Sequence, residues 1–179
     1  LHETVGPTDG QDPIAHYIQV MADKTGSLIS ASARLGIILS GAPAKFEEPM
    51  RLYGEKIGVA FQLIDDVIDI SEAGPSGKTP GTDLRAGVPT LPVLLLRKAA
   101  ATGDQGAIDL LELIDGGLEE DAKLHEALVR LRNHPVAEEA YQEAKRWADE
   151  AVADVQVLPD GPVKNALATF AQAVVDRQQ

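Results

Sequence analysis

The sequence contains no cysteine, few aromatic residues and no long apolar run, and each absence excludes a class of protein. Without cysteine the chain holds no disulfide and no thiolate metal site, which fits a reducing cytosol, so we expect a cytoplasmic protein. No run approaches the roughly 18 apolar residues that a transmembrane segment needs. Aromatic residues make up only 4%. Helices packed through alanine and aliphatic side chains are therefore favoured over an aromatic-rich β-sandwich.

Basic residues are also scarce, because 16 Lys and Arg face 28 Asp and Glu and give a net charge of −12. Such a surface is repelled by nucleic acid and by anionic lipid, so we expect neither as a partner. A polyphosphate ligand would need a local site helped by a metal ion. The sequence begins at Leu1 without an initiator methionine, and we expect it to be a fragment of a longer chain.

The apolar residues recur at helical spacing almost throughout, and no alternating strand pattern persists. The pattern therefore predicts an all-α fold with one domain over residues 1–179. Asp12-Pro13 is typical of a helix start, and Gly41 with Pro43 is typical of a helix end. Residues 24–26 interrupt the first helix, so a kink or short break is expected there. The expected helices cover residues 13–40, 44–70, 90–101, 104–115, 119–133, 135–156 and 161–177, with a long loop over 72–89.

Three carboxylates stand in the most apolar part of the second expected helix. Asp65 and Asp69 are one turn apart on one face, Asp66 flanks them, and Gln62 lies one turn earlier. Buried like charges are costly, and no Lys or Arg occurs from residue 57 to residue 77 to balance them. Oxygen ligands with room for water suit Mg²⁺. The pattern favours a Mg²⁺ site over the alternative, a solvated acidic face.

Two lysine-containing segments accompany these carboxylates. Lys78 lies in the glycine-rich expected loop, where a mobile lysine can close over a diphosphate. The loop is not a Walker A sequence, because Glu72 stands where that motif needs its first glycine. Lys24-Thr25 interrupts an apolar helix, and taken alone it indicates a helix irregularity more strongly than a site.

Together these residues resemble the C-terminal half of the trans-isoprenyl diphosphate synthases, and the long-chain polyprenyl branch looks closest. The matching segments keep the family's order and spacing over roughly residues 13–95. They are Lys24-Thr25, Phe61-Gln62-x-x-Asp65-Asp66-x-x-Asp69, Gly77-Lys78-x-x-Gly81-x-Asp83-Leu84 and Thr90-Leu91-Pro92.

The resemblance implies an orthogonal helical bundle of the isoprenoid synthase type. It also implies Mg²⁺-dependent head-to-tail condensation of an allylic diphosphate with isopentenyl diphosphate, and a homodimer. The chemistry is physically consistent, because a leaving diphosphate needs concentrated positive charge and an allylic cation needs dry walls. By position the implied metal-binding residues are Asp65, Asp66 and Asp69, with Asp65 and Asp69 as the direct ligands. The implied substrate-binding residues are Lys24, Lys78 and Asp83, and the implied catalytic residues are Lys24, Thr25 and Gln62.

The chain departs from the family pattern in two ways. It lacks the first aspartate-rich motif, so we expect it to be the C-terminal part of a synthase and inactive alone. Val88 stands where many relatives have lysine, which weakens one expected diphosphate contact. Two alternatives stay open: a non-catalytic subunit of a heteromeric prenyl synthase, and a class I terpene cyclase. The cyclase's usual second metal motif is not found in the sequence.

Overall fold

The structure is a computed structural model that describes residues 6–72 and 79–178. Over these residues the regular structure is helical and contains no strand, which confirms the all-α fold class. None of the helices described is both long and apolar enough to cross a membrane. The chain forms two compact units, one of the residues up to Ile64 together with those from Glu143 onward, and one of Asp65–Gln142.

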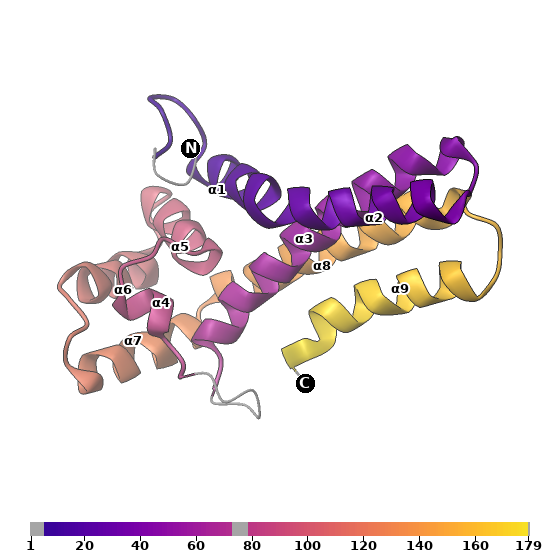
Figure 1. The fold of residues 1–179 in the computed structure, drawn as a ribbon. Coiled ribbons are helices and arrows are strands. Elements are labelled where there is room, and N and C mark those ends of the chain that lie inside the picture. Colours follow the sequence, from indigo (N-terminus) through magenta and orange to yellow (C-terminus); the bar gives the residue numbers. More distant parts are fainter. Residues whose placement is uncertain (1–5, 73–78, 179) are drawn as a thin grey trace. The chain divides into compact units, whose positions relative to one another are not determined.

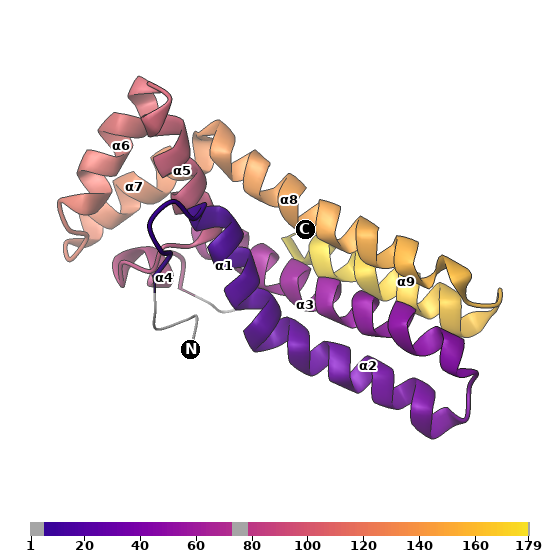
Figure 2. The ribbon, with the colours of Figure 1, turned by 90° about the horizontal axis from the view of Figure 1, so that it is seen from above.

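The first unit is built around α3 (Glu47–Ile70), most of which belongs to it. Within this unit Figures 1 and 2 show α2, α9 and the later part of α8 running alongside α3. The other elements are α1 (Pro13–Met21), a π-helical turn (Ala22–Gly26), α2 (Ser27–Ser40), α8 (Pro135–Asp154), α9 (Pro162–Val175), and short 3-10 turns at Ala44–Phe46, Val155–Val157 and Asp176–Gln178.

The ends of the first long helical segment are where the sequence predicts them. Asp12 Oδ1 accepts a hydrogen bond from the Ile14 N–H at 3.0 Å, and Pro13 occupies the first helical position. These two residues satisfy or remove backbone donors that have no partner inside the helix. At the other end, Gly41 takes a left-handed conformation with φ of 70°, which an L side chain rarely adopts.

Three glycines let α3 approach the preceding helical segment at backbone contact. A Cβ atom added to Gly58 would lie 2.5 Å from the Gly26 Cα, and one added to Gly54 would lie 2.7 Å from the Ser30 Cα. Both distances are far shorter than any real carbon–carbon contact, so the crossing requires glycine. These positions thereby fix where the π-helical turn lies along α3.

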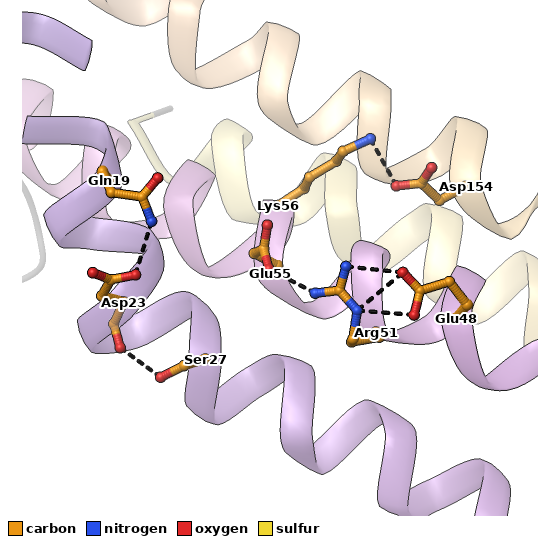
Figure 3. Close-up of polar contacts among 8 residues, drawn as sticks. All are labelled: Gln19, Asp23, Ser27, Glu48, Arg51, Glu55, Lys56 and Asp154. Atoms are coloured by element: carbon orange, nitrogen blue, oxygen red, sulfur yellow. Dashed lines mark hydrogen bonds and ion pairs between the residues drawn. The ribbon is translucent and has the colours of Figure 1, made fainter. Parts of the chain in front are cut away.

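Polar contacts join α3 to α8 and also link side chains along the surface of α3 itself (Figure 3). Lys56 Nζ lies 2.8 Å from Asp154 Oδ2, and both side chains are largely buried. Arg51 bonds to Glu48 and Glu55, one turn away on either side. Along α8 a row of alanines is fully buried, which lets neighbouring helices approach closely: Ala144, Ala148 and Ala151.

The second unit contains the last turns of α3, the start of α8 and four complete helices. Within it α6 packs against both α5 and α7. The helices are α4 (Thr82–Arg85), α5 (Leu91–Ala101), α6 (Gln105–Asp115) and α7 (Asp121–Asn133). The short helix α4 corrects the expectation of an unbroken loop over 72–89. It begins after Gly81, whose φ is 78°, and its first amides are bonded to an aspartate side chain described below.

Candidate functional site

The last two turns of α3 carry the three predicted metal-binding carboxylates. Asp66 is 7% exposed, whereas Asp65 and Asp69 are half-buried. The C-terminal end of a helix is the negative end of its dipole, and α3 has no basic residue in its last turn. The carboxylates are therefore disfavoured both by the dipole and by one another. A cation bound at this end of α3 would offset both effects.

Asp66 is bonded to the start of another helix. Its Oδ2 accepts a hydrogen bond from the Leu91 N–H at 3.0 Å, at the first position of α5. The neighbouring Thr90 is also buried. The bond joins residues 25 positions apart in the sequence. Asp66 therefore ties the end of α3 to the start of α5 within the second unit.

Asp69 holds the start of α4 in a similar way. Its two carboxylate oxygens accept from the Thr82 N–H at 3.1 Å and the Asp83 N–H at 3.2 Å. The Asp69 carbonyl oxygen accepts from the Gly81 N–H at 2.7 Å. Burial raises the pKa of the Asp69 carboxyl, the nearby Asp83 carboxylate raises it further, and the backbone donors only partly counter these effects. The ionised form of the Asp69 carboxyl is therefore disfavoured in this structure, and a nearby cation would stabilise it.

The carboxylates at the end of α3 could supply only some of the ligands that a Mg²⁺ ion needs. Among residues 6–72 and 79–178 no three His, Cys, Asp or Glu side chains gather closely enough to hold a metal ion. An all-protein cage over the described chain is therefore absent. Mg²⁺ commonly uses one or two carboxylates and completes its shell with water and phosphate oxygens. Asp65 and Asp69, at i and i+4, fit that limited role, and the trio as a ligand set stays a prediction.

The predicted Lys24 and Thr25 lie in the π-helical turn of the first unit, where Lys24 is exposed and Thr25 is half-buried. The expected kink or break is instead a continuous helix with one wider turn, a feature often found at functional sites. The turn is supported at Asp23, whose carbonyl oxygen accepts from Ser27 Oγ at 2.6 Å and whose Oδ1 accepts from Gln19 Nε2 at 2.8 Å (Figure 3).

The structure brings Gln62 to this turn. Gln62 Nε2 lies 3.8 Å from the sulfur of Met21, the residue that directly precedes the π-helical turn. Gln62 is half-buried on α3, one helical turn from the Gly58 crossing point. Within the first unit, α3 thus meets the π-helical turn at Gly58, which lies against Gly26 and the Thr25 backbone, and meets the residue before the turn at Gln62. The catalytic roles of Lys24, Thr25 and Gln62 stay predictions, and the predicted Lys78 lies outside the described residues.

Two groups that sequence reasoning missed hold the carboxylate end of α3. Arg132 on α7 donates from Nε to the Ile70 carbonyl oxygen at 3.0 Å and pairs with Glu72 at 3.2 Å. A cation at a helix C-terminus is stabilising, so Arg132 partly compensates the missing basic residue of α3. The other group is the α5 backbone at Leu91. Both partners are far away in sequence, so no local pattern could have indicated them.

A cavity of about 730 Å³ lies in the second unit between the Thr79–Thr82 segment and α7. Its arginines are already engaged, Arg85 with Asp121 and Arg132 with Glu72. Among the predicted site residues that the structure describes, none lines this cavity.

Comparison with known proteins gives consistent relatives. The sequence profile of the family described as "Polyprenyl synthetase" matches residues 5–131. The chain is 40% identical to the nonaprenyl diphosphate synthase of Mycobacterium tuberculosis, over 99% of this chain and 52% of that protein. It is 34% identical to the octaprenyl diphosphate synthase of Escherichia coli, over 92% of this chain and 50% of that protein.

Solved structures give the same result. A geranylgeranyl pyrophosphate synthase from Corynebacterium glutamicum, crystallised with calcium and isoprenyl diphosphate, superposes with a TM-score of 0.87 at 38% identity. That match covers 98% of this chain and 54% of the solved chain. The chain thus spans about half the length of the relatives it matches. With its helical fold, its carboxylate-bearing α3 and a matching profile over most of its length, the chain belongs to the polyprenyl synthetase family.

Proposed function

We propose that this chain is the part of a polyprenyl diphosphate synthase that carries its second aspartate-rich motif. The synthase condenses an allylic diphosphate head-to-tail with isopentenyl diphosphate, in a Mg²⁺-dependent reaction, to make a longer polyprenyl diphosphate. The observation that carries the proposal is the end of α3, where three carboxylates accumulate without a basic residue in the last turn. Family membership and the names of the relatives support the same reaction.

The proposed site residues of this chain fall into two groups. One group binds the metal ion and the diphosphate, and the other faces the reacting carbon atoms. Asp65 and Asp69 are proposed as the direct Mg²⁺ ligands, with Asp66 beside them. When bound, Mg²⁺ neutralises the charge that develops on the departing diphosphate. Lys24 and Lys78 bind the allylic diphosphate as point charges. Asp83 is proposed as a third residue of this substrate-binding site. Thr25 and Gln62 turn their dipoles toward the reacting carbons.

Exposed apolar faces support an active form that contains more polypeptide than these residues. On α2 the side chains of Leu28, Leu35 and Leu39 are 70%, 53% and 82% exposed, and on α9 Phe170 is 54% exposed. Each of these helices carries a single Lys or Arg and no acidic residue, so the faces are nearly uncharged. Large apolar patches on a soluble surface mark interaction sites. We propose that the missing half of the synthase covers them.

The proposal also covers the binding partners of the protein and its cellular compartment. We propose a homodimer working in the cytoplasm, with small diphosphates as substrates and without nucleic acid. The net charge of −12 supports the exclusion of nucleic acid, and the absence of cysteine supports a reducing compartment. The runner-up is a non-catalytic subunit of a heteromeric prenyl synthase, and the same uncovered faces on α2 and α9 favour it.

The test is a condensation assay on two preparations. One is the natural polypeptide that carries these residues, with its intact mass measured first, and the other is the 179-residue chain alone. We expect Mg²⁺-dependent elongation by a synthase-length polypeptide and no product from the 179-residue chain. Product from the short chain would contradict the need for a second half. A short natural polypeptide that gains activity only with a second protein would establish the subunit alternative.

A further inference from the structure

We propose that Asp66 is a positioning residue that fixes the start of α5. The bond from the Leu91 N–H to Asp66 Oδ2 is 3.0 Å long, and it is buried at both ends, with Asp66 7% and Leu91 0% exposed. The inference assigns different roles to adjacent aspartates of one motif. The inference rests on the proposed function only for the role of the segment that Asp66 positions, which is to lie beside the diphosphate.

The start of α5 lacks a cap of its own. The first amides of any helix have no partner inside it, and a side chain just before the helix usually supplies an acceptor. Here the Thr90 side chain makes no such bond, and Pro92 has no N–H to satisfy. The first regular helical bond runs from the Leu94 N–H to the Thr90 carbonyl. The buried Leu91 N–H therefore depends on Asp66, which reaches it from another helix.

The bond is favourable for two physical reasons. A carboxylate at a helix N-terminus interacts with the positive end of the dipole, and a charged acceptor makes a stronger hydrogen bond than a neutral one. Loss of the acceptor would leave a buried donor unsatisfied, which is costly. Asp69 likewise accepts hydrogen bonds from the first amides of α4, but in a more exposed setting, because Asp69 is only half-buried.

The segment fixed in this way precedes α5 and contains Val88. The Val88 N–H donates to the Asp83 carbonyl at 3.0 Å, and the Thr90 N–H donates to the Val88 carbonyl at 2.9 Å. Residues 83–91 are thus a chain of short backbone bonds anchored at one end by Asp66. Under the proposed function this segment lies beside the diphosphate, so Asp66 would act on substrate through the backbone it holds.

The experiment is residue-resolved amide exchange on the synthase-length polypeptide that carries these residues, comparing wild type with Asp66→Ala and Asp66→Asn. In wild type the Leu91 amide should exchange at least about tenfold more slowly than that of Gln105, the first residue of α6, whose N-cap Asp104 bonds to Ala107 instead. Asp66→Ala should speed exchange at Leu91 at least about tenfold, whereas Asp66→Asn keeps an oxygen acceptor without its charge and should have a clearly smaller effect, of no more than about fivefold.

Asp65→Ala and Asp65→Asn are the matched controls, and neither should change exchange at Leu91. The proposal is overturned if the wild-type Leu91 amide exchanges as fast as that of Gln105, or if Asp66→Asn loses protection as completely as Asp66→Ala. Should Asp66→Ala fail to fold, wild type and Asp66→Asn decide the question between them. The readout involves no condensation, so it stands or falls independently of the synthase assignment.

Discussion

At the scale of single residues, Tyr53 is a buried group whose contribution can be measured directly. It is 4% exposed, and its hydroxyl donates to the Leu167 carbonyl oxygen at 2.8 Å, joining α3 to α9. Tyr53→Phe should lower the free energy of unfolding by about 0.5–1.5 kcal/mol at neutral pH, the usual net value of one hydrogen bond. Urea denaturation of the two proteins measures the difference.

The same residue gives a pH dependence with a definite sign. Burial raises the pKa of Tyr53 to about 12 from an ordinary 10.0. Because the folded pKa is the higher one, the stabilisation by Tyr53 is complete below pH 10.0 and is lost as the pH rises toward about 12. The stability gap between wild type and Tyr53→Phe should therefore narrow over that range. A gap that stayed constant would contradict the burial of this hydroxyl.

Sequence reasoning found the aspartates of the motif but not what they bind. Asp65, Asp66 and Asp69 stand out because they lie in an apolar helix without nearby lysine or arginine. Their contacts come from positions 25 residues away for Asp66 and 14 for the Asp69–Asp83 bond. These partners are brought together by the packing of helices that are distant in sequence. A local sequence pattern carries no information about that packing.

At the scale of elements, the crossing of α3 with the π-helical turn predicts opposite effects for two glycine substitutions. Gly58→Ala would place a Cβ 2.5 Å from the Gly26 Cα, and backbone cannot move aside cheaply. We expect it to destabilise the fold by about 1–3 kcal/mol. Gly36→Ala is the matched control in α2, where a Cβ would meet nothing within 4 Å. It should stabilise by about 0.5–1 kcal/mol. Thermal melts that ranked the two substitutions the other way would refute the close crossing.

Most helices were predictable because the signals for them are local in sequence. These signals are the periodic spacing of apolar residues and the residues that begin and end a helix. The α5 helix was expected over 90–101 and runs from Leu91 to Ala101, and α7 was expected over 119–133 and runs from Asp121 to Asn133. The short α4 was missed, because four residues show no period and the Asp69 carboxylate that caps them is distant in sequence. The sequence predicted the π-helical turn only as an interruption, because the close contact of Gly26 with Gly58 on α3 joins positions distant in sequence.

At the scale of the whole molecule, the uncovered face of α2 should make the isolated chain self-associate. Leu28 and Leu39 are 70% and 82% exposed and lie on a helix whose only charged side chain is Arg34. Replacing both leucines by glutamine should reduce association in sedimentation measurements without lowering the melting temperature, because neither is packed. Leu63→Gln is the contrasting control, since Leu63 is 0% exposed and its replacement should unfold the chain. A monomeric wild-type chain would show that these faces need no cover.

Above all, we propose that Asp65 holds a metal ion that stabilises charge on a departing diphosphate. The most direct measurement is the kcat of Asp65→Ala beside that of Lys78→Ala, both in a synthase-length polypeptide carrying these residues. Asp65→Ala should lower kcat by about 10²–10³, by analogy with the loss of an oxyanion-hole donor, because the charge develops mainly in the transition state. Lys78→Ala should be milder and act more on KM. A kcat for Asp65→Ala within about threefold of wild type, or a larger loss for Lys78→Ala, would contradict the account.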